Sequence, residues 1–309
     1  MEKLAIIGCG TMGHSIALNA AWVGVQVKLY GVDDDDIQKG LTGISEKLDT
    51  LLKNDLITEP ECTRIFERIT GTGSLSELVN GATFIIECIP EVLSLKNELF
   101  KKLDEICSPD VVLATNTSGL SPSRIAANIK YPHRAIATHF WNPAHLIPLV
   151  EVLRTELTDD NTFNRAMEML KFMNKRPIEV KKEVPGLVGN RLQFALFREA
   201  LYLLEQGIAS KEDIDTAVSS SIGRRLPVSG PLLSADMGGL DVFASISDYL
   251  FKDLSHADHA SEALKELVSK GNFGQKNGEG FYLWDEEFSR EMNRRREEQL
   301  IRFLKEDKQ

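Results

Sequence analysis

The feature that most constrains the fold is the spacing of three glycines near the amino terminus. They stand in Gly8-Cys9-Gly10-Thr11-Met12-Gly13, between an apolar run at 3–7 and a helical stretch at 14–23. Gly24 ends that stretch, and residues 25–30 read as a second strand. The order strand, glycine loop, helix, strand is the context in which G-x-G-x-x-G indicates a dinucleotide-binding unit. The alternative is a glycine-rich turn that binds no ligand.

Each glycine has a distinct role in such a unit. Gly8 makes the tight turn, Gly10 lets the backbone approach a pyrophosphate, and Gly13 lets the helix pack closely on the sheet. The helix presents its free N–H groups to the phosphates. We therefore include Thr11 and Met12, which lie between the glycines, in the predicted cofactor site.

The residues after the second strand favour NAD over NADP. The acid that normally binds the adenosine ribose is expected about 18 residues past Gly13, where this chain has Gly31. Four aspartates, Asp33 to Asp36, follow at once. Acids favour the first turn of a helix, so the run reads either as a helix start or as a substitute in which Asp33 binds the ribose. A 2′-phosphate would meet this acidic run with no nearby arginine, so we expect NAD.

Composition excludes several classes of protein. The 309 residues suffice for two domains, and 42% hydrophobic with 27% charged residues is typical of a globular protein. A net charge of -10 argues against nonspecific nucleic-acid binding. Apolar runs of membrane-spanning length and a signal peptide are missing, which predicts no membrane partner. The four scattered cysteines favour a reducing cytoplasm, and the histidine spacing predicts no metal.

The pattern of elements changes once along the chain. Further strands are expected at 83–88, 111–114, 134–140, 149–153 and 177–181, with helices between them, and 37–70 reads as two amphipathic helices. From residue 187 the periodicity is helical almost to the end. The break at Glu183-Val184-Pro185-Gly186 predicts a boundary there. We expect an α/β Rossmann-like domain with a mostly parallel sheet at 1–184, and an all-α domain at 185–309.

A histidine and a glutamate on consecutive strands form the candidate catalytic pair. His139 lies at the end of one apolar run, an Asn142-Pro143 turn follows, and Glu151 lies in the next run. Side chains placed in this way can sit side by side, as a base and the acid that orients it. A lone histidine is more often a satisfied core residue. His145, close by, is interpreted as a loop histidine at the mouth of a substrate site.

Two polar residues are candidates for holding a substrate oxygen near this pair. Ser118 follows a strand in Asn116-Thr117-Ser118, at the edge where open α/β sheets bind ligands. The plainer interpretation of this cluster is a cap for the next helix. Asn190 lies in the first turn of the apolar helix expected at 187–206.

Taken together, these residues resemble the 3-hydroxyacyl-CoA dehydrogenase family. The matching segments include the glycine loop, 116–118, 139–143 with 149–151, 185–191 and 278–282, and their order covers nearly the whole chain. The resemblance implies a catalytic His139–Glu151 pair with Ser118 and Asn190 near the reacting oxygen. It also implies a helical domain that dimerises, and it places Glu91, Lys96 and Asn116 near the cofactor.

The chain departs from the family pattern where substrate choice is expected. Ala144 to Pro148 is similar to branches that act on free hydroxy acids, such as the carnitine and gulonate dehydrogenases with lambda-crystallin. The leading hypothesis is hydride transfer between NAD and the C3 hydroxyl of a 3-hydroxyacyl-CoA. The alternatives are a free 3-hydroxy acid as substrate, or an NAD-binding protein without turnover.

Overall fold

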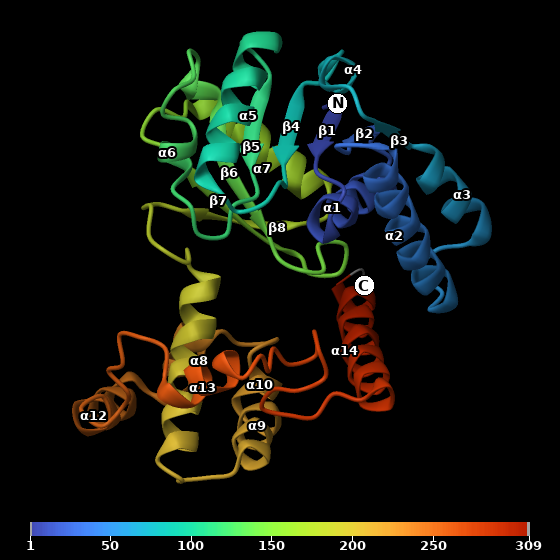
Figure 1. The fold of residues 1–309 in the computed structure, drawn as a ribbon. Helices are drawn as coiled ribbons and strands as arrows, with labels where there is room; N and C mark the ends of the chain where they lie inside the picture. Colours follow the sequence, from blue (N-terminus) through green and yellow to red (C-terminus); the bar gives the residue numbers. More distant parts are fainter. Residues whose placement is uncertain (1, 308–309) are drawn as a thin grey trace. The chain divides into compact units, whose positions relative to one another are not determined.

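The structure is a computed structural model that describes residues 2–307, and it contains two compact units. The first unit contains residues up to Val188 together with 296–307, and the second contains Gly189–Arg295. The predicted boundary, between 184 and 185, therefore lies four residues before the one observed. Figure 1 shows the elements of each unit.

The first unit is built on an eight-stranded sheet, as the predicted Rossmann-like class requires. The strands are β1 (Leu4–Ile7), β2 (Val27–Tyr30), β3 (Ile69–Thr72), β4 (Phe84–Glu87), β5 (Val112–Thr115), β6 (Ala135–Phe140), β7 (Leu149–Arg154) and β8 (Arg176–Val180). Their order is β3-β2-β1-β4-β5-β6-β7-β8. Neighbouring strands are parallel except β6 and β7, which are antiparallel. The mostly parallel sheet is confirmed.

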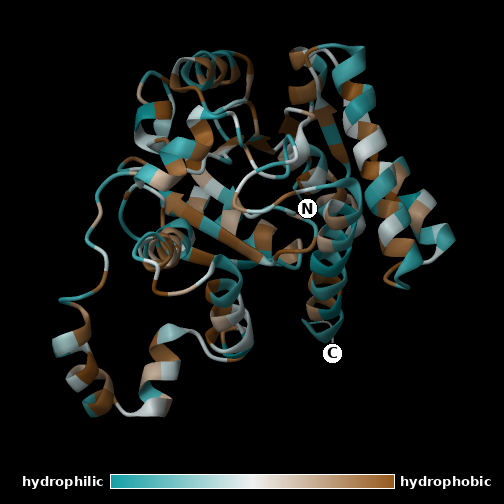
Figure 2. Cartoon of the chain, turned by 60° about the horizontal axis from the view of Figure 1, so that its bottom comes forward, coloured by the Kyte–Doolittle hydropathy of each residue, from teal (hydrophilic) through white to brown (hydrophobic). Residues whose placement is uncertain are grey.

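The strands bury side chains on both faces of the sheet. In β1, Leu4 and Ile6 join one core cluster, whereas Ala5 and Ile7 join the other, as the twofold period of a strand demands. In Figure 2 the central strands carry mainly the hydrophobic colour. A sheet covered on both faces explains why the sequence shows unbroken apolar runs instead of alternation.

Helices of the first unit cover these two faces. They are α1 (Thr11–Trp22), α2 (Asp34–Lys53), α3 (Glu59–Glu67), α4 (Leu75–Val79), α5 (Leu93–Ile106), α6 (Pro122–Ile125) and α7 (Asp160–Phe172), with a 3₁₀ turn at Pro132–Arg134. Side chains of Asp33, Ser74, Ser121 and Asp159 cap four of these helices. The capped α6 is one turn long.

One strand was missed in the sequence. The sequence pattern predicts helices over 37–70, but the segment ends in β3, which pairs with β2 at the edge of the sheet. Only Ile69 of this strand is buried, and Gly71 interrupts its pattern. An edge strand of four residues with one buried side chain has too few alternating apolar and polar positions for the sequence to indicate a strand.

The second unit is all helical, as predicted. It contains α8 (Gly189–Glu205), α9 (Lys211–Ser220), α10 (Ile222–Arg225), α11 (Pro231–Gly238), α12 (Leu240–Leu250), α13 (Glu262–Ser269) and the first part of α14 (Glu286–Asp307). Isolated bridges join Glu279 to Gly274 and to Leu283 in the glycine-rich segment. None of the described helices is both long and apolar enough to span a membrane.

The carboxyl-terminal half of α14 belongs to the first unit, whereas the whole tail was predicted to belong to the second. Ile301 is buried in the larger core cluster, and Leu300 and Leu304 pack against it. Arg176 Nη2 lies 2.6 Å from Asp307 Oδ1. The amphipathic pattern shows that one face of the helix is buried, but it does not specify which partner buries it.

Candidate active site

The glycine loop adopts the backbone that its sequence predicts. Gly8 has φ +109°, and a Cβ atom there would lie 2.8 Å from the carbonyl oxygen of Cys88. A Cβ atom on Gly13 would lie 1.7 Å from the oxygen of Gly8, so helix α1 and the loop can touch only without a side chain. Gly10 faces open space, and α1 begins at Thr11 without a side-chain cap. Its first N–H groups are therefore available to a pyrophosphate.

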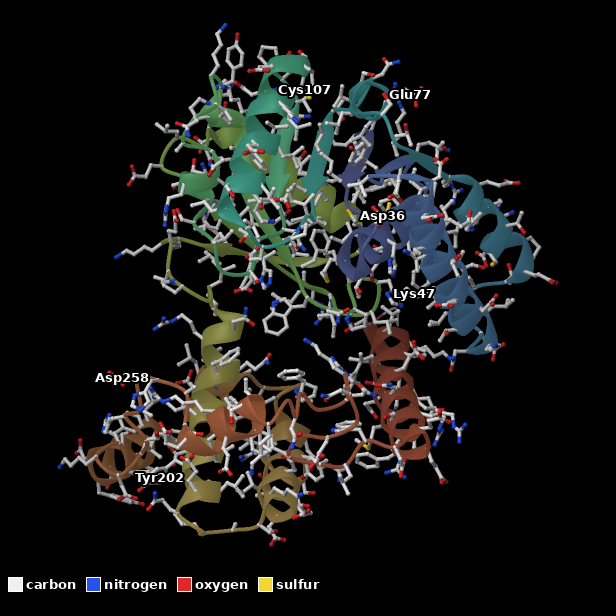
Figure 3. The ribbon with its side chains drawn as sticks, in the orientation of Figure 1. Asp36, Lys47, Glu77, Cys107, Tyr202 and Asp258 are labelled. Atoms are coloured by element: carbon white, nitrogen blue, oxygen red, sulfur yellow. The ribbon has the colours of Figure 1, made fainter. Side chains whose placement is uncertain are left out.

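The end of β2 explains why no acid stands at Gly31. A Cβ atom there would lie 2.7 Å from Cγ1 of Ile37 and 3.0 Å from Sγ of Cys9, so a carboxylate would displace the packing of α2. Asp33 caps α2, because its Oδ1 accepts a hydrogen bond of 2.7 Å from Asp36 N. Asp36 in turn accepts from Val32 N, and Figure 3 marks it near the start of α2. The helix-start interpretation of the run is thus observed, and the ribose contact of Asp33 stays a prediction.

His139 and Glu151 lie directly opposite each other on β6 and β7. His139 Nδ1 is 2.9 Å from Glu151 Oε2, and both side chains are buried. The same carboxylate accepts hydrogen bonds from Trp141 Nε1 at 3.1 Å and from Val188 N at 2.8 Å. These donors fix the orientation of the carboxylate beside the imidazole. The geometry predicted for the pair is present.

Ser118 is exposed at the carboxyl end of β5, and its loop is held by Glu91. Glu91 Oε1 accepts hydrogen bonds from Ser118 N at 2.9 Å, from Gly119 N at 3.1 Å and from Thr117 Oγ1 at 2.5 Å. Burial alone would raise the pKa of Glu91, but the hydrogen bond from Thr117 and the charge of Lys96 outweigh it and lower that pKa. Glu91 is therefore a carboxylate that fixes the Ser118 loop.

Lys96 lies buried between two carboxylates, and its predicted place near the cofactor stays a prediction. It is 1% exposed, and its Nζ is 2.5 Å from Glu87 Oε1 and 3.3 Å from Glu91 Oε2. Within this network Lys96 contacts Glu91, the carboxylate that holds the Ser118 loop. Glu87 was missed in the sequence, although an acid ending the apolar run Phe84–Glu87 was the available signal. Its second oxygen accepts from Thr115 Oγ1 at 2.7 Å.

Asn116 joins the two strands of the site. Its Oδ1 accepts a hydrogen bond of 2.8 Å from Phe140 N, the residue after His139. The amide therefore ties the end of β5 to the end of β6 and sets the spacing between the Ser118 loop and the histidine strand. A direct cofactor contact of Asn116 stays a prediction.

A cavity of about 290 Å³ opens beside Ser118. Ser121 and Glu183 supply further polar groups to its wall, and Glu183 brings a charge. The remaining wall is mainly apolar, from Leu120, Pro122, Ala137, Leu153, Val184, Pro185 and Leu187. A small pocket with few polar groups at the end of a parallel strand fits a small-molecule site.

His145 lies in the connection between β6 and β7, as predicted, and its side chain is buried; its place at a substrate mouth stays a prediction. The side chain is 3% exposed, and its Nδ1 lies 2.9 Å from Ser15 Oγ of α1. Burial lowers the pKa of His145 to about 3, with Lys47 and Lys175 adding to the effect. A neutral, buried imidazole bonded to a helix is a structural group, and no local pattern in the sequence indicates this partner 130 residues away.

Asn190 lies in the second unit, in the first turn of α8. The structure therefore supports its predicted place at the start of a helix. Its approach to the reacting oxygen stays a prediction.

Comparisons with known proteins identify both halves of the chain. Residues 3–184 match the family model described as 3-hydroxyacyl-CoA dehydrogenase, NAD binding domain, and residues 186–284 match the 3-hydroxyacyl-CoA dehydrogenase, C-terminal domain. A 5-formyl-3-hydroxy-2-methylpyridine 4-carboxylate 5-dehydrogenase of Mesorhizobium japonicum is 35% identical over 301 residues, 97% of this chain and 96% of that protein. A probable 3-hydroxybutyryl-CoA dehydrogenase of Bacillus subtilis is 35% identical over 94% of this chain and 99% of that protein.

A solved structure described as the same kind of dehydrogenase as the first of these relatives also matches the chain. The crystal structure of a 5-formyl-3-hydroxy-2-methylpyridine 4-carboxylic acid 5-dehydrogenase, described as an NAD+ dependent dismutase, aligns with a TM-score of 0.92 and 34% identity. The alignment covers 100% of this chain and 99% of that one.

Proposed function

The chain belongs to the 3-hydroxyacyl-CoA dehydrogenase family and is an NAD-dependent oxidoreductase acting on CH–OH groups, and we propose that His139 is its general base. The observation that carries this proposal is the buried 2.9 Å contact between His139 Nδ1 and Glu151 Oε2. A carboxylate can only accept, so Nδ1 carries the proton and Nε2 keeps the lone pair that would take the proton of the substrate. The Glu151 carboxylate also stabilises the imidazolium that forms, as an acid does in a catalytic triad.

The other site residues position the reactants in this proposal. The glycine loop and the start of α1 would hold the pyrophosphate of NAD, and the bound nicotinamide supplies the hydride acceptor. Ser118 Oγ, presented by Glu91, hydrogen-bonds the substrate oxygen whose proton His139 removes. Asn190 is proposed as a second donor to that oxygen. In the reverse direction His139 returns the proton to the carbonyl oxygen.

We propose a compact free acid as the substrate class. Two observations support it: the whole-chain similarity to the pyridine carboxylate dehydrogenase, and the departure of Ala144 to Pro148 from the acyl-CoA pattern. An aldehyde enters this chemistry as its hydrate, whose CH–OH group loses a hydride and a proton to give the acid. A short 3-hydroxyacyl-CoA is the second candidate, favoured by the 3-hydroxybutyryl-CoA dehydrogenases among the relatives.

A side-by-side assay separates the two substrate classes. NAD⁺ is supplied with 3-hydroxybutyryl-CoA, with free 3-hydroxybutyrate, or with a 5-formylpyridine 4-carboxylate, and NADH absorbance is followed. We expect kcat/KM for a free acid to exceed that for the thioester by at least about tenfold. The thioester lacks the free carboxylate, and the loss of one buried contact between substrate and site costs about that factor. If only the thioester is turned over, an acyl-CoA replaces the free acid as the proposed substrate class. Loss of turnover for every substrate would favour a non-catalytic protein.

We propose that the chain forms a homodimer through its second unit. Large apolar side chains on and beside α11 and α12 are more than half exposed, namely Leu232, Leu233, Met237, Leu240, Tyr249 and Phe251. An apolar patch of this kind marks an interface, and a second copy is the commonest partner. Light scattering is expected to give twice the chain mass of 34.5 kDa. A particle of one chain mass at micromolar concentration would refute the dimer.

A further inference from the structure

The connection between the two strands of the His139–Glu151 pair is held by hydrogen bonds from other elements. Residues 141–148 link β6 to β7, and Ala144 and Leu146 within them are buried. On one side, however, His145, Leu146 and Pro148 line a cavity of about 800 Å³. Hydrogen bonds from outside the loop add to its packing on that side.

Lys175 provides two of these hydrogen bonds. The side chain is 7% exposed, and its Nζ donates to the carbonyl oxygens of Ala144 at 2.5 Å and Ile147 at 3.1 Å. Its neighbour Arg176 donates its backbone N–H to Pro148 O at 2.8 Å. Burial lowers the pKa of Lys175 to about 7. Lysine is among the residues least often fully buried, so its placement against two loop carbonyls indicates a specific role.

A second attachment reaches the loop from helix α1. Ser15 Oγ lies 2.9 Å from His145 Nδ1 and accepts the backbone N–H of His145 at 3.2 Å. Ser15 lies just past the glycine loop, on the helix whose start faces the cofactor phosphates. The loop is thus attached on one side to the cofactor helix and on the other to the start of β8.

The loop also carries a direct partner of the catalytic acid. Trp141 Nε1 and His139 Nδ1 donate to the same oxygen of Glu151, at 3.1 and 2.9 Å. A shift of the loop that moves Trp141 would therefore change how Glu151 holds the imidazole. Misplacement of a reacting group by about 1 Å can lower a rate by about a hundredfold.

We propose that Lys175 is a positioning residue for the His139–Glu151 pair, acting through the 141–148 loop together with the Ser15–His145 contact. This inference rests on the proposed function of His139 as the base. It assigns no contact between Lys175 and the substrate. Instead, Lys175 keeps Trp141 and the imidazole in one arrangement relative to the cofactor helix.

The test compares Lys175→Met with Lys171→Met, which removes an exposed lysine from the wall of the same cavity. Turnover is measured with whichever substrate of the assay above is active, and NADH affinity is measured by its fluorescence. We expect kcat of Lys175→Met to fall by roughly tenfold to a hundredfold, with the NADH Kd and the substrate KM within about twofold. Lys171→Met should match the wild type. A change of kcat below about twofold, or a parallel loss of NADH affinity, would overturn the proposal.

Ser15→Ala keeps the proposal testable if Lys175→Met does not fold. It removes only one small hydroxyl and is expected to lower kcat without changing substrate KM. In a double-mutant cycle, two groups that hold one loop should be non-additive, so the double variant loses less than the product of the single losses. Full additivity would contradict a shared loop.

Activity retained in His139→Gln would defeat the proposed function itself. Loss of activity in His139→Gln together with normal activity of Lys175→Met would defeat only this inference.

Discussion

Replacing His139 by glutamine is expected to lower kcat by about 10²- to 10⁴-fold, the usual contribution of a positioned base. Glutamine keeps a hydrogen bond to Glu151 but cannot accept a proton from the substrate. NADH affinity should stay within about twofold, because the cofactor phosphates are assigned to the glycine loop and α1. Steady-state turnover and NADH fluorescence measure the two quantities separately.

Two further variants test whether the loss of kcat is specific to the His139–Glu151 pair. Glu151→Gln leaves the histidine in place but removes the carboxylate that orients it, so it should also lower kcat, and the double variant should be no worse than His139→Gln alone. His259→Gln changes an exposed histidine of the second unit and should match the wild type. Turnover of His139→Gln within a few-fold of wild type would remove His139 from the mechanism.

The His139–Glu151 pair could be predicted because its geometry follows from local rules. Two apolar runs joined by a short connection with an Asn-Pro turn form adjacent antiparallel strands, and their register brings His139 opposite Glu151. The glycine loop was predictable from its motif and its place between a strand and a helix. Only the demand on Gly13 is local, because its Cβ would meet the oxygen of Gly8, whereas a Cβ on Gly8 would meet Cys88, far away in the sequence. Gly31 showed that the usual acid is missing, but the packing of Ile37 and Cys9 that explains it is visible only in the structure.

The features that were missed depend on partners far away in the sequence. His145 is buried against Ser15, and the end of α14 is buried against the first unit. Lys96 matches a cofactor position by its family resemblance, yet its charge is enclosed by Glu87 and Glu91. A sequence shows that a residue is charged or apolar, but only the tertiary packing determines which neighbour satisfies it.

The second large effect is expected from Lys96→Met, which should lower the free energy of unfolding by about 3–5 kcal/mol. Glu87 is fully buried, and the substitution would leave its carboxylate with hydrogen bonds from Thr115 and Ile89 but without its counter-ion. Removing both charges should cost less than removing one, so Glu87→Gln combined with Lys96→Met is expected to recover part of the loss. Denaturant unfolding of the full chain, followed by fluorescence, measures both variants.

The same variant should also affect the active site, because Lys96 is the cation beside Glu91, and Glu91 holds the backbone of Ser118. With the lysine gone, kcat is expected to fall in the folded protein, and the Glu87→Gln/Lys96→Met pair should recover stability more than turnover. Lys102→Met, an exposed position on the same helix, is the control and should change stability by no more than about 0.5 kcal/mol. A Lys96→Met protein as stable as this control would mean that the buried carboxylate does not depend on its ion pair.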